Sequence, residues 1–341
     1  MKKIKIAQIG VGHDHASSVI DTLAHNDNFD LVGYAFPESD EAFYEKNKAA
    51  YAPFPRMSID ELLAVPGLEA VAVETNEHDL TTCAALAAAH GFHVHMDKPG
   101  GEDAKAFEDM LRTMKRKNLV FSPGYMYRYN PEILKLMDRI RAGELGKIVN
   151  VEAHMDCEHP AWKRAWLNEY KGGMMFFLGC HLLDLVFRIM GTPDEVVNLN
   201  RASGKDGVDA LDQGFCVLTY PHAACLVHSS DAEPGGFLRR QLVVTGEKES
   251  VKLEPLEAYT DQPGMQTTGV RECEGGHGWA YDGVRRTSEP FHRYHAMLDA
   301  FAAYIRGEKE NPYSYEYECR LHRIVLAASG IRTDYRGKIE L

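Results

Sequence analysis

The sequence lacks the cysteine patterns that stabilise secreted proteins or hold zinc. Its seven cysteines are an odd number, and no Cys-x-x-Cys pair occurs. It also has no run approaching the ~18 apolar residues of a membrane span. The most apolar stretch, residues 174–190, is interrupted by His181, Asp184 and Arg188. We therefore expect a protein of a reducing compartment, the cytoplasm, with no membrane partner.

An excess of basic residues is missing as well. The chain has 38 Lys and Arg against 50 Asp and Glu, which gives a net charge of −12. No basic stripe compensates, which argues against a protein whose affinity comes from neutralising phosphates, so we expect no nucleic-acid partner. The 341 residues, 45% of them hydrophobic, suit a globular chain of about two domains.

Short apolar runs alternate with helical periods over the first third of the chain. The expected strands are residues 4–9, 31–36, 70–73, 92–94 and 120–121. The expected helices follow residues 16–23, a capping box at Ser58, residues 78–90 and residues 105–117. Strands and helices that alternate with short connections predict a parallel sheet covered by helices on both faces.

The pattern changes beyond Pro123-Gly124. A helix opens at Asn130-Pro131, and another covers residues 174–190, but strand signals otherwise dominate. The expected strands are residues 148–155, 196–202, 214–219, 224–229, 238–244 and 250–253, and helices at 292–305 and 319–328 close the chain. We therefore predict two domains, residues 1–123 and 124–341, the second built on one antiparallel or mixed sheet.

A glycine turn, Gly10-Val11-Gly12, lies between the first strand and the first helix. Glycines there let backbone amides approach a pyrophosphate at the helix N-terminus, although an ordinary tight turn has the same pattern. Phe36 occupies the end of the second strand, where an acid normally bonds the adenosine ribose. Glu38 either reaches the ribose instead or is an exposed turn residue, so the choice between NAD and NADP stays open.

Polar segments follow two further strands of the first domain. They are residues 74–78, with Thr75 and Asn76, and residues 95–100, with Lys98. The carboxyl ends of parallel strands line the ligand crevice, so both segments should face a cofactor. A partly desolvated lysine there can exchange a proton with a substrate hydroxyl. The alternative is a solvated surface lysine beside a proline.

The segment after residue 153 is dense in metal-ligand residue types. His154 and Asp156 share one strand face, but the spacing fixes no third ligand, and polar residues at a cleft mouth usually contact substrate or water. We therefore expect no metal. Trp162-Lys163 is a better prospect for binding, because indoles stack on sugar rings while lysine bonds hydroxyls; otherwise the tryptophan packs under a loop.

Together these motifs resemble those of the Gfo/Idh/MocA oxidoreductases, the glucose-fructose oxidoreductase and inositol dehydrogenase group. The likeness spans nearly the whole chain and rests on Gly10-x-Gly12, Thr75-Asn76-Glu77-His78, Asp97-Lys98-Pro99 in place of the family's Glu-Lys-Pro, Arg128 with Asn130-Pro131, and the segment 172–184. It implies an α/β protein with an N-terminal Rossmann dinucleotide-binding domain. It also implies a C-terminal α+β domain whose large, mostly antiparallel open sheet often serves oligomer contacts.

The resemblance further implies an NAD(P)-dependent oxidoreductase that transfers hydride between NAD or NADP and a secondary hydroxyl or ketone of a sugar, polyol or sugar acid. A homo-oligomer, dimer or tetramer, is expected. Lys98 would be the acid/base, with a cis peptide to Pro99, and His181 would bond the reacting hydroxyl. The implied substrate-binding residues are Arg128, Trp162, Lys163 and Asp184. The implied cofactor-binding residues are Gly10, Gly12, His13, His15, Glu38, Thr75, Asn76, His78, Asp97 and Pro99.

One position departs from the family. Phe177 stands where the family has a catalytic Asp, four residues before His181, and a phenyl ring cannot accept a proton. Asp184 or Glu158 could substitute, although Asp184 could instead pair with Arg188 one turn later. Two alternatives therefore stay open: a glycoside-cleaving or eliminating enzyme that uses NAD without net redox, and a non-catalytic sugar or dinucleotide sensor.

Overall fold

The computed structural model describes residues 2–279, 281–332 and 334–341. Contacts divide the chain into two compact units. The first comprises Met1–Tyr125, Tyr294–His322 and Lys338–Leu341, and the second comprises Met126–Arg293 and Arg323–Gly337. Residues 294–322 and 338–341 thus pack with the first unit, whereas the expected division assigned everything after residue 123 to the second.

The physical reason is the apolar face of helix α9 (His295–Ile305). Phe301 is fully buried and stacks on Phe29 with ring centroids 6.4 Å apart, and Asn26 Nδ2 donates to Asp299 at 2.8 Å. The apolar face of a helix can be recognised in the sequence and predicts that this face is buried. It does not predict which part of the chain covers the face.

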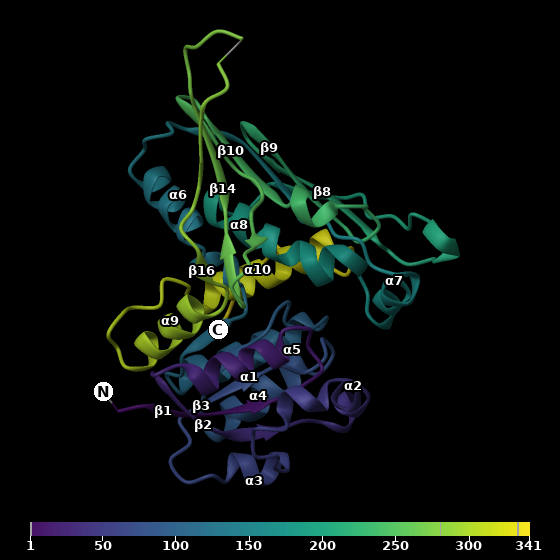
Figure 1. Cartoon of the computed structure of the whole chain (residues 1–341), viewed down its shortest axis with the longest axis vertical. Coiled ribbons are helices and arrows are strands. Elements are labelled where there is room, and N and C mark those ends of the chain that lie inside the picture. Colours follow the sequence, from purple (N-terminus) through teal and green to yellow (C-terminus); the bar gives the residue numbers. More distant parts are fainter. Residues whose placement is uncertain (1, 280, 333) are drawn as a thin grey trace. The chain divides into compact units, whose positions relative to one another are not determined.

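The first unit is built on a five-stranded parallel sheet in the order β2-β1-β3-β4-β5. Its strands are β1 (Ile4–Ile9), β2 (Phe29–Ala35), β3 (Ala70–Val73), β4 (His93–Met96) and β5 (Phe121–Pro123). The helices around it are α1 (Ala16–His25), α2 (Glu41–Tyr51), α3 (Ile59–Leu63), α4 (Leu80–His90), α5 (Ala104–Arg116) and α9 (Figure 1). The expected Rossmann arrangement is confirmed.

Local sequence signals account for several of these elements. The Ser58 and Glu61 side chains form the capping box that opens α3. Gly91, in the left-handed region at φ +92°, ends α4. All four residues of β3 are buried, as expected of a central parallel strand covered on both faces.

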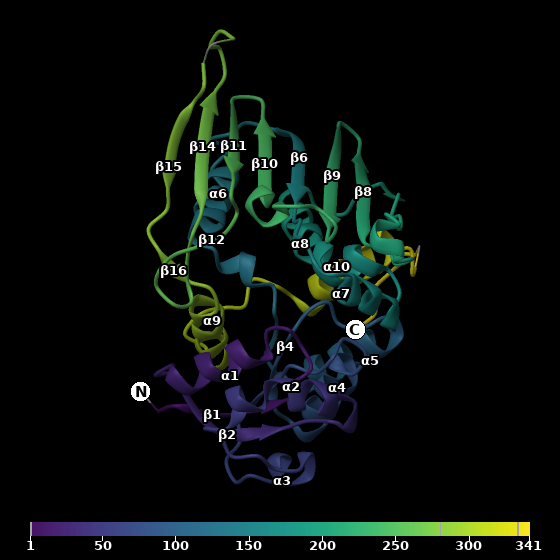
Figure 2. The same ribbon diagram turned by 45° about the vertical axis from the view of Figure 1, so that its right-hand side comes forward.

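The second unit contains an eight-stranded sheet in the order β15-β14-β11-β10-β6-β9-β8-β7 (Figure 2). Its strands are β6 (Ile148–His154), β7 (Glu195–Asn198), β8 (Gln213–Tyr220), β9 (Ala223–Ser230), β10 (Gln241–Gly246), β11 (Glu249–Leu253), β14 (Gly269–Glu274) and β15 (Val284–Thr287). Neighbours pair antiparallel except β6 and β9, which are parallel. The expected large, mostly antiparallel sheet is confirmed.

Helices and a small sheet complete the second unit. They are α6 (Pro131–Arg141), α7 (Ala161–Trp166), α8 (Cys180–Met190) and the three-stranded sheet of β12 (Ala258–Tyr259), β13 (Met265–Thr267) and β16 (Phe291–His292). A π-helical turn, Met175–Gly179, leads directly into α8. The last helix, α10 (Tyr315–Ala328), belongs to the first unit up to His322 and to the second from Arg323.

The sequence analysis missed the strands between residues 258 and 292. Arg271 and Glu272 are neighbours in β14, and β15 contributes Arg285 and Arg286 at the edge of the sheet. Consecutive charges erase the alternation that marks a strand. The strand expected at 238–244 begins at Gln241, because Gly236–Arg239 forms a 3-10 helix.

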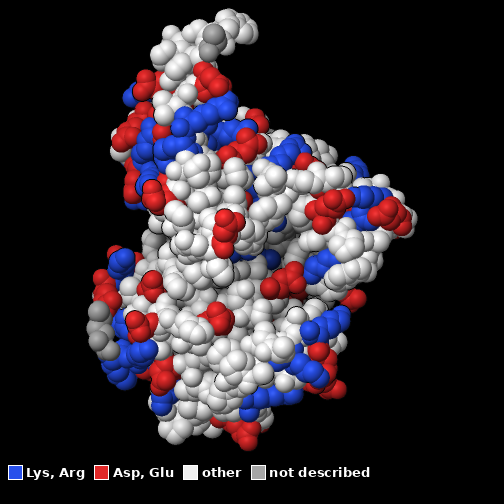
Figure 3. Space-filling view, in the orientation of Figure 1, with Lys and Arg blue, Asp and Glu red and all other residues white. Residues whose placement is uncertain are grey.

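The surface carries both signs of charge. On the face shown in Figure 3, Lys and Arg groups lie beside Asp and Glu groups over each unit. Across the described part of the chain, no helix is both long enough and apolar enough to cross a bilayer.

Gly10 provides a test of the tight β1-α1 turn. Its φ is +107°, and a Cβ there would lie 2.2 Å from the backbone nitrogen of Thr75, whereas a Cβ at Gly91 would meet nothing within 4 Å. We expect Gly10→Ala to lower the free energy of unfolding by about 2–4 kcal/mol, through strain plus collision. Gly91→Ala should cost only about 1 kcal/mol. Urea denaturation measures both, and equal costs would contradict this account of the turn.

Candidate cofactor and catalytic site

The glycine turn of the first unit is held by a buried carboxylate that the sequence analysis did not single out. Asp40 Oδ2 accepts hydrogen bonds from the backbone N–H groups of Val11 (2.8 Å) and Gly12 (2.9 Å). Its Oδ1 accepts from the Asn76 backbone N–H (3.1 Å) and from Asn76 Nδ2 (2.9 Å). Asp40 therefore ties the β1-α1 turn to the segment that follows β3.

Asp40, rather than Glu38, is the acid of the β2-α2 connection that reaches the glycine turn. Glu38 begins the 3-10 helix Glu38–Asp40 and is exposed, whereas Asp40 is buried. Burial raises the pKa of Asp40, and the hydrogen bonds from Val11 and Asn76 oppose that shift. The end of β2 is aromatic: the Phe36 ring lies 4.9 Å from that of Tyr44, and the Arg56 guanidinium carbon lies 4.4 Å from the Phe36 ring centre.

The residues of this turn fit a dinucleotide. A Cβ at Gly12 would lie 2.3 Å from Asp40 Oδ1, so the close approach of the turn requires glycine. The side chain of the N-cap residue, His15, makes no capping hydrogen bond, and the first turn of α1 carries no acid. The positive end of α1 is thus not neutralised by a carboxylate of its own first turn, which suits a phosphate.

Asp97 brings together the residues at the carboxyl ends of β1 and β4. Its Oδ2 lies 3.0 Å from His13 Nδ1 and 2.9 Å from His15 Nδ1, and its Oδ1 accepts the Lys98 backbone N–H at 2.7 Å. His13 Nε2 lies 3.8 Å from Glu77 Oε1. The structure therefore gathers three of the predicted site residues, His13, His15 and Lys98, around a fourth, Asp97.

Burial and neighbouring charges shift the pKa values of these residues in different directions. Burial works against ionisation of Asp97, but the contacts with His13 and His15 hold its pKa well below the usual range. Burial, reinforced by the Asp97 charge, raises the pKa of Glu74 well above its usual value, and burial raises that of Glu77. Burial also lowers the pKa of His15 to about 4. At neutral pH, therefore, the His15 imidazole is neutral, the contacts of Asp97 favour its ionised form, and burial favours the protonated form of Glu74.

Lys98 is almost wholly buried beside these groups, with 1% of its surface exposed. Its positive charge favours the ionised forms of Glu74 and Glu77 and the neutral form of His15. The Lys98–Pro99 peptide is cis, as the family resemblance implied. The solvated surface lysine considered as the alternative is excluded by this burial.

Two further residues expected at the cofactor differ in exposure. Thr75 is fully buried, and its hydroxyl donates to the Asn76 carbonyl oxygen at 3.0 Å. His78 lies more openly, with 46% of its side chain exposed and its Nδ1 4.0 Å from Glu102 Oε2.

His181 belongs to the second unit and lies in the first turn of α8, 1% exposed. Its ring packs edge-on against Tyr127, with centroids 5.2 Å apart. The Tyr127 hydroxyl donates to Glu257 Oε1 at 2.5 Å, and Glu257 also binds Arg240 and Arg293. Burial raises the pKa of Tyr127. The imidazole of His181 is thus oriented by a phenol that is itself fixed by a buried acid.

Arg128 and Asp184 contact each other in the second unit, each 1% exposed. Arg128 Nε lies 3.0 Å from both Asp184 oxygens, and its Nη2 donates to Oδ1 at 2.7 Å. Asp184 thus pairs with Arg128, and Arg188 Nη1 donates to the Arg128 carbonyl oxygen at 3.5 Å. Both residues had been expected at the substrate, and their side chains join the 3-10 helix Met126–Tyr129 to α8.

Phe177 lies in an aromatic cluster rather than alone. Its ring meets Trp166 edge-on at 5.2 Å, and Lys163 Nζ lies 3.7 Å from the Trp166 ring centre and 5.3 Å from that of Phe177. The lysine ammonium is therefore held by aromatic faces near the position where the family has a carboxylate. Trp162 is 70% exposed, so it does not pack under a loop.

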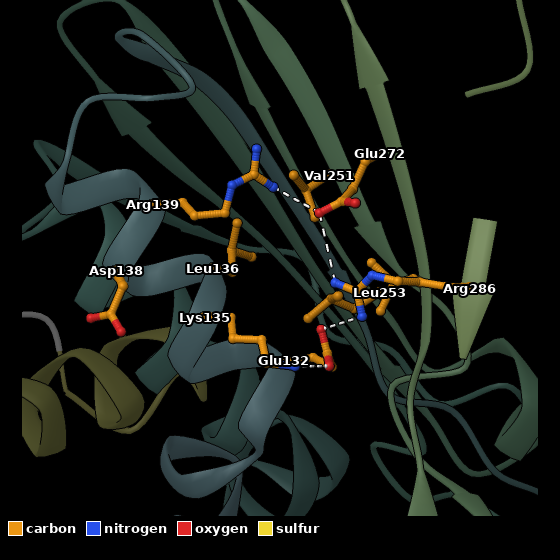
Figure 4. A pocket seen from close by; sticks show the side chains of 10 residues that line it. Glu132, Lys135, Leu136, Asp138, Arg139, Val251, Leu253, Glu272 and Arg286 are labelled. Atoms are coloured by element: carbon orange, nitrogen blue, oxygen red, sulfur yellow. Dashed lines mark hydrogen bonds and ion pairs between the residues drawn. The ribbon is translucent and has the colours of Figure 1, made fainter. Parts of the chain in front are cut away.

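One groove of the second unit, about 340 Å³, contains none of the predicted site residues. It lies between α6 and the β11, β14 and β15 strands (Figure 4). Its charges pair with one another: Arg286 Nη1 lies 2.7 Å from Glu132 Oε2, and Arg139 Nη1 lies 2.8 Å from Glu272 Oε1. These contacts join α6 to β14 and β15.

Family comparison matches both halves of the chain. The pattern described as an oxidoreductase family with an NAD-binding Rossmann fold matches residues 4–125, and the GFO/IDH/MocA C-terminal domain matches residues 133–252. The chain belongs to the Gfo/Idh/MocA family. Its nucleotide cofactor is accordingly NAD or NADP, and the family resemblance drawn from the motifs is confirmed.

Individual relatives of this Gfo/Idh/MocA protein are distant. An uncharacterized oxidoreductase of Schizosaccharomyces pombe is 30% identical over 43% of this chain and 42% of that protein. The scyllo-inositol 2-dehydrogenase (NADP+) of Bacillus subtilis is 24% identical over 54% of this chain and 52% of that enzyme. The alignments with the first curated relatives span less than half of their length. The aldose-aldose oxidoreductase of Caulobacter crescentus has a similar fold, with a TM-score of 0.77 and 20% identity over 97% of both chains.

Three functional candidates, Asp40, Tyr127 and Glu257, were missed from the sequence. Asp40 stands four residues after Phe36, so an acid slightly beyond the end of the second strand was the available signal. Tyr127 precedes Arg128 directly. Glu257 had no such signal, because its contacts come from residues 127, 240 and 293.

Because His95 is buried, we expect the protein to be less stable at acidic pH. Burial lowers its pKa from 6.5 to about 4, so between these values the unfolded chain binds a proton that the folded chain does not. Relative to His95→Phe, the wild type should lose about 3 kcal/mol of unfolding free energy as the pH falls from 7 to 4. Urea denaturation across this range measures it. The exposed His222→Gln should follow the wild type, and parallel curves for His95→Phe would contradict the buried neutral imidazole.

Asp184→Asn tests the buried ion pair. The substitution leaves the Arg128 charge buried without its partner, so we expect a loss of about 3–5 kcal/mol in unfolding free energy. The control Asp138→Asn removes an exposed pair with Arg141, both about two-thirds exposed, and should change stability by less than about 0.5 kcal/mol. A stable Asp184→Asn variant that has lost turnover would instead show a substrate ligand.

Proposed function

We propose that this protein is an NAD(P)-dependent dehydrogenase that acts on a secondary hydroxyl, or the corresponding ketone, of a sugar, polyol or sugar acid. The observation that carries the proposal is Lys98, buried at the carboxyl end of β4 beside Asp97, Glu74 and Glu77 in an NAD-binding Rossmann unit. A bound nicotinamide supplies hydride transfer at its C4. The chain must then supply the group that moves the hydroxyl proton.

Lys98 is the residue that exchanges this proton in our proposal. The Lys98 charge acts to lower the pKa of Glu77 and Glu74, and Asp97 fixes the Lys98 backbone through the 2.7 Å hydrogen bond. His181 orients the reacting hydroxyl, and Tyr127 holds the imidazole in place. Arg128 and Asp184 act as positioning residues through their mutual ion pair, and Trp162 and Lys163 contact the sugar ring.

The names of the relatives support the substrate class. An inositol dehydrogenase and an aldose oxidoreductase are among the similar proteins. The choice between NAD and NADP stays open, since the end of β2 presents Phe36 with Arg56 over its face rather than an acid. A homo-oligomer of two or four copies stays part of the proposal.

Lys98→Ala is the direct test. It should lower kcat by about 100-fold or more with the best substrate of a polyol and sugar panel, because general acid–base help contributes about that factor. Cofactor affinity, measured by fluorescence titration of NADH and NADPH, should stay within a few-fold. The control Lys105→Ala removes an exposed lysine, 83% of whose side chain is accessible, and should leave both quantities unchanged. Equal loss of cofactor binding in Lys98→Ala would argue against the proton-transfer role.

Phe177 favours one alternative reaction on the same residues. A phenyl ring among Trp166 and Lys163 cannot share protons with His181, so a transient oxidation followed by elimination and re-reduction remains a second candidate. Product that forms with catalytic amounts of cofactor and no change in NADH absorbance would favour it. A cofactor that binds without any turnover over the whole panel would favour the sensor.

A further inference from the structure

Three metal-ligand side chains that have no role in the proposed reaction converge on one face of the large sheet. His154 ends β6, Asp156 follows two residues later, and His228 lies on β9. His154 and His228 are paired residues of the parallel β6-β9 ladder, the two central strands that run side by side in Figure 2. One nitrogen of each imidazole and one carboxylate oxygen all lie within 4.8 Å of one another.

The contact distances are close to those of a coordination site. His228 Nδ1 lies 3.2 Å from Asp156 Oδ1, and His154 Nδ1 lies 3.9 Å from Asp156 Oδ2. Ligands that bind zinc at about 2.0–2.2 Å in a tetrahedron stand roughly 3.4 Å apart. Small rotations of the two rings therefore suffice to place all three atoms around one ion.

These polar atoms are otherwise unsatisfied. Among the described residues, His154 Nδ1, His228 Nδ1 and Asp156 Oδ2 have no hydrogen-bond partner, although the exposed fractions of the three side chains are only 9%, 17% and 0%. A fully buried carboxylate oxygen without a partner is costly, and a cation removes that cost.

The protein's own cations do not fill this place. Arg239 Nη1 lies 4.0 Å from Asp156 Oδ2, beyond hydrogen-bond distance, and it binds Glu233 at 2.7 Å with nearly half of its side chain exposed. Arg240 Nε donates to the main-chain oxygen of Asp156 at 3.2 Å rather than to its carboxylate.

We propose that His154, Asp156 and His228 form a binding site for one divalent transition-metal ion, with Zn²⁺ as the ion that fits best. Two imidazoles and one carboxylate suit zinc, whereas Ca²⁺ and Mg²⁺ prefer all-oxygen sites. The accessible edge of His228 leaves room for water as a further ligand. The ion cross-links β6 and β9, the one parallel pair in the large sheet of the described chain.

The site lies on the side of the sheet opposite to Val151 and Ala153 of β6. Val151 and Ala153 are fully buried, and side chains alternate along the strand, so His154 faces the other way. The sequence analysis expected no metal because spacing fixed only two ligands. The third comes from 74 positions further along the chain, on the adjacent strand.

Metal titration of the full-length protein tests the proposal. After dialysis against EDTA, Zn²⁺ is added in competition with a chromogenic chelator, and Co²⁺ is followed by its visible absorption. We expect one ion per chain, with Co²⁺ bands of a four- or five-coordinate nitrogen and oxygen site and without the intense thiolate band of a cysteine ligand. His228→Gln and His154→Gln should weaken binding about 100-fold or more, since even outer-shell changes cost 10–100-fold. His222→Gln, on the exposed turn between β8 and β9, should bind like the wild type.

Folding and location are controlled separately. Zn²⁺ should raise the Tm of the wild type but not that of His228→Gln, whose circular dichroism reports whether it folds. His15→Gln tests the other group of metal-ligand side chains, His13, His15 and Asp97. Binding that is lost in His15→Gln and retained in both His228→Gln and His154→Gln would overturn the proposal, as would the absence of any bound ion at a Zn²⁺ concentration of about 100 μM, far above ordinary structural-site affinities.

Discussion

The arrangement of the candidate site in the first unit depends on the carboxylate of Asp97, which stays ionised although it is buried. Its Oδ2 contacts His13 and His15, and its Oδ1 accepts a hydrogen bond from the Lys98 backbone N–H. A Cβ added at Gly124 would lie 2.6 Å from Oδ1. A buried charge persists only when such partners surround it. The Asp97 charge adds to the burial that raises the pKa of Glu74, and it opposes the burial that lowers the pKa of His15.

The second unit also pairs its buried charges with partners of opposite sign. Arg128 and Asp184 neutralise each other between the 3-10 helix Met126–Tyr129 and α8, and Glu257 is compensated by Arg240 and Arg293 while it holds Tyr127. In each unit, a pre-formed polar framework fixes a catalytic candidate, Lys98 in one and His181 in the other. Such frameworks orient reactive groups before a substrate arrives.

Much of this fold could be predicted from signals between adjacent residues. Contacts between residues far apart in the sequence could not be predicted in this way. The capping box at Ser58, the cap at Gly91 and the apolar run of β3 each depend on a few adjacent residues, and each appears in the structure. The motif around Lys98 was legible for the same reason. By contrast, the bonds from Asp40 to Val11, from Arg128 to Asp184 and from Glu257 to Tyr127 join residues 29, 56 and 130 positions apart. No local pattern encodes such contacts, because they depend on how whole elements pack.

The π-helical turn before α8 determines in which direction the residues just before His181 point. A π turn accommodates one residue more than an α turn, and each added residue rotates the upstream helix by roughly 100° relative to the downstream one. Phe177 lies within this turn, four residues before His181. Deletion of one residue between Phe177 and His181 would remove the extra residue of this turn and rotate Phe177 by roughly 100° relative to His181. A one-residue insertion or deletion in this turn would therefore remodel the surroundings of His181 as strongly as a substitution.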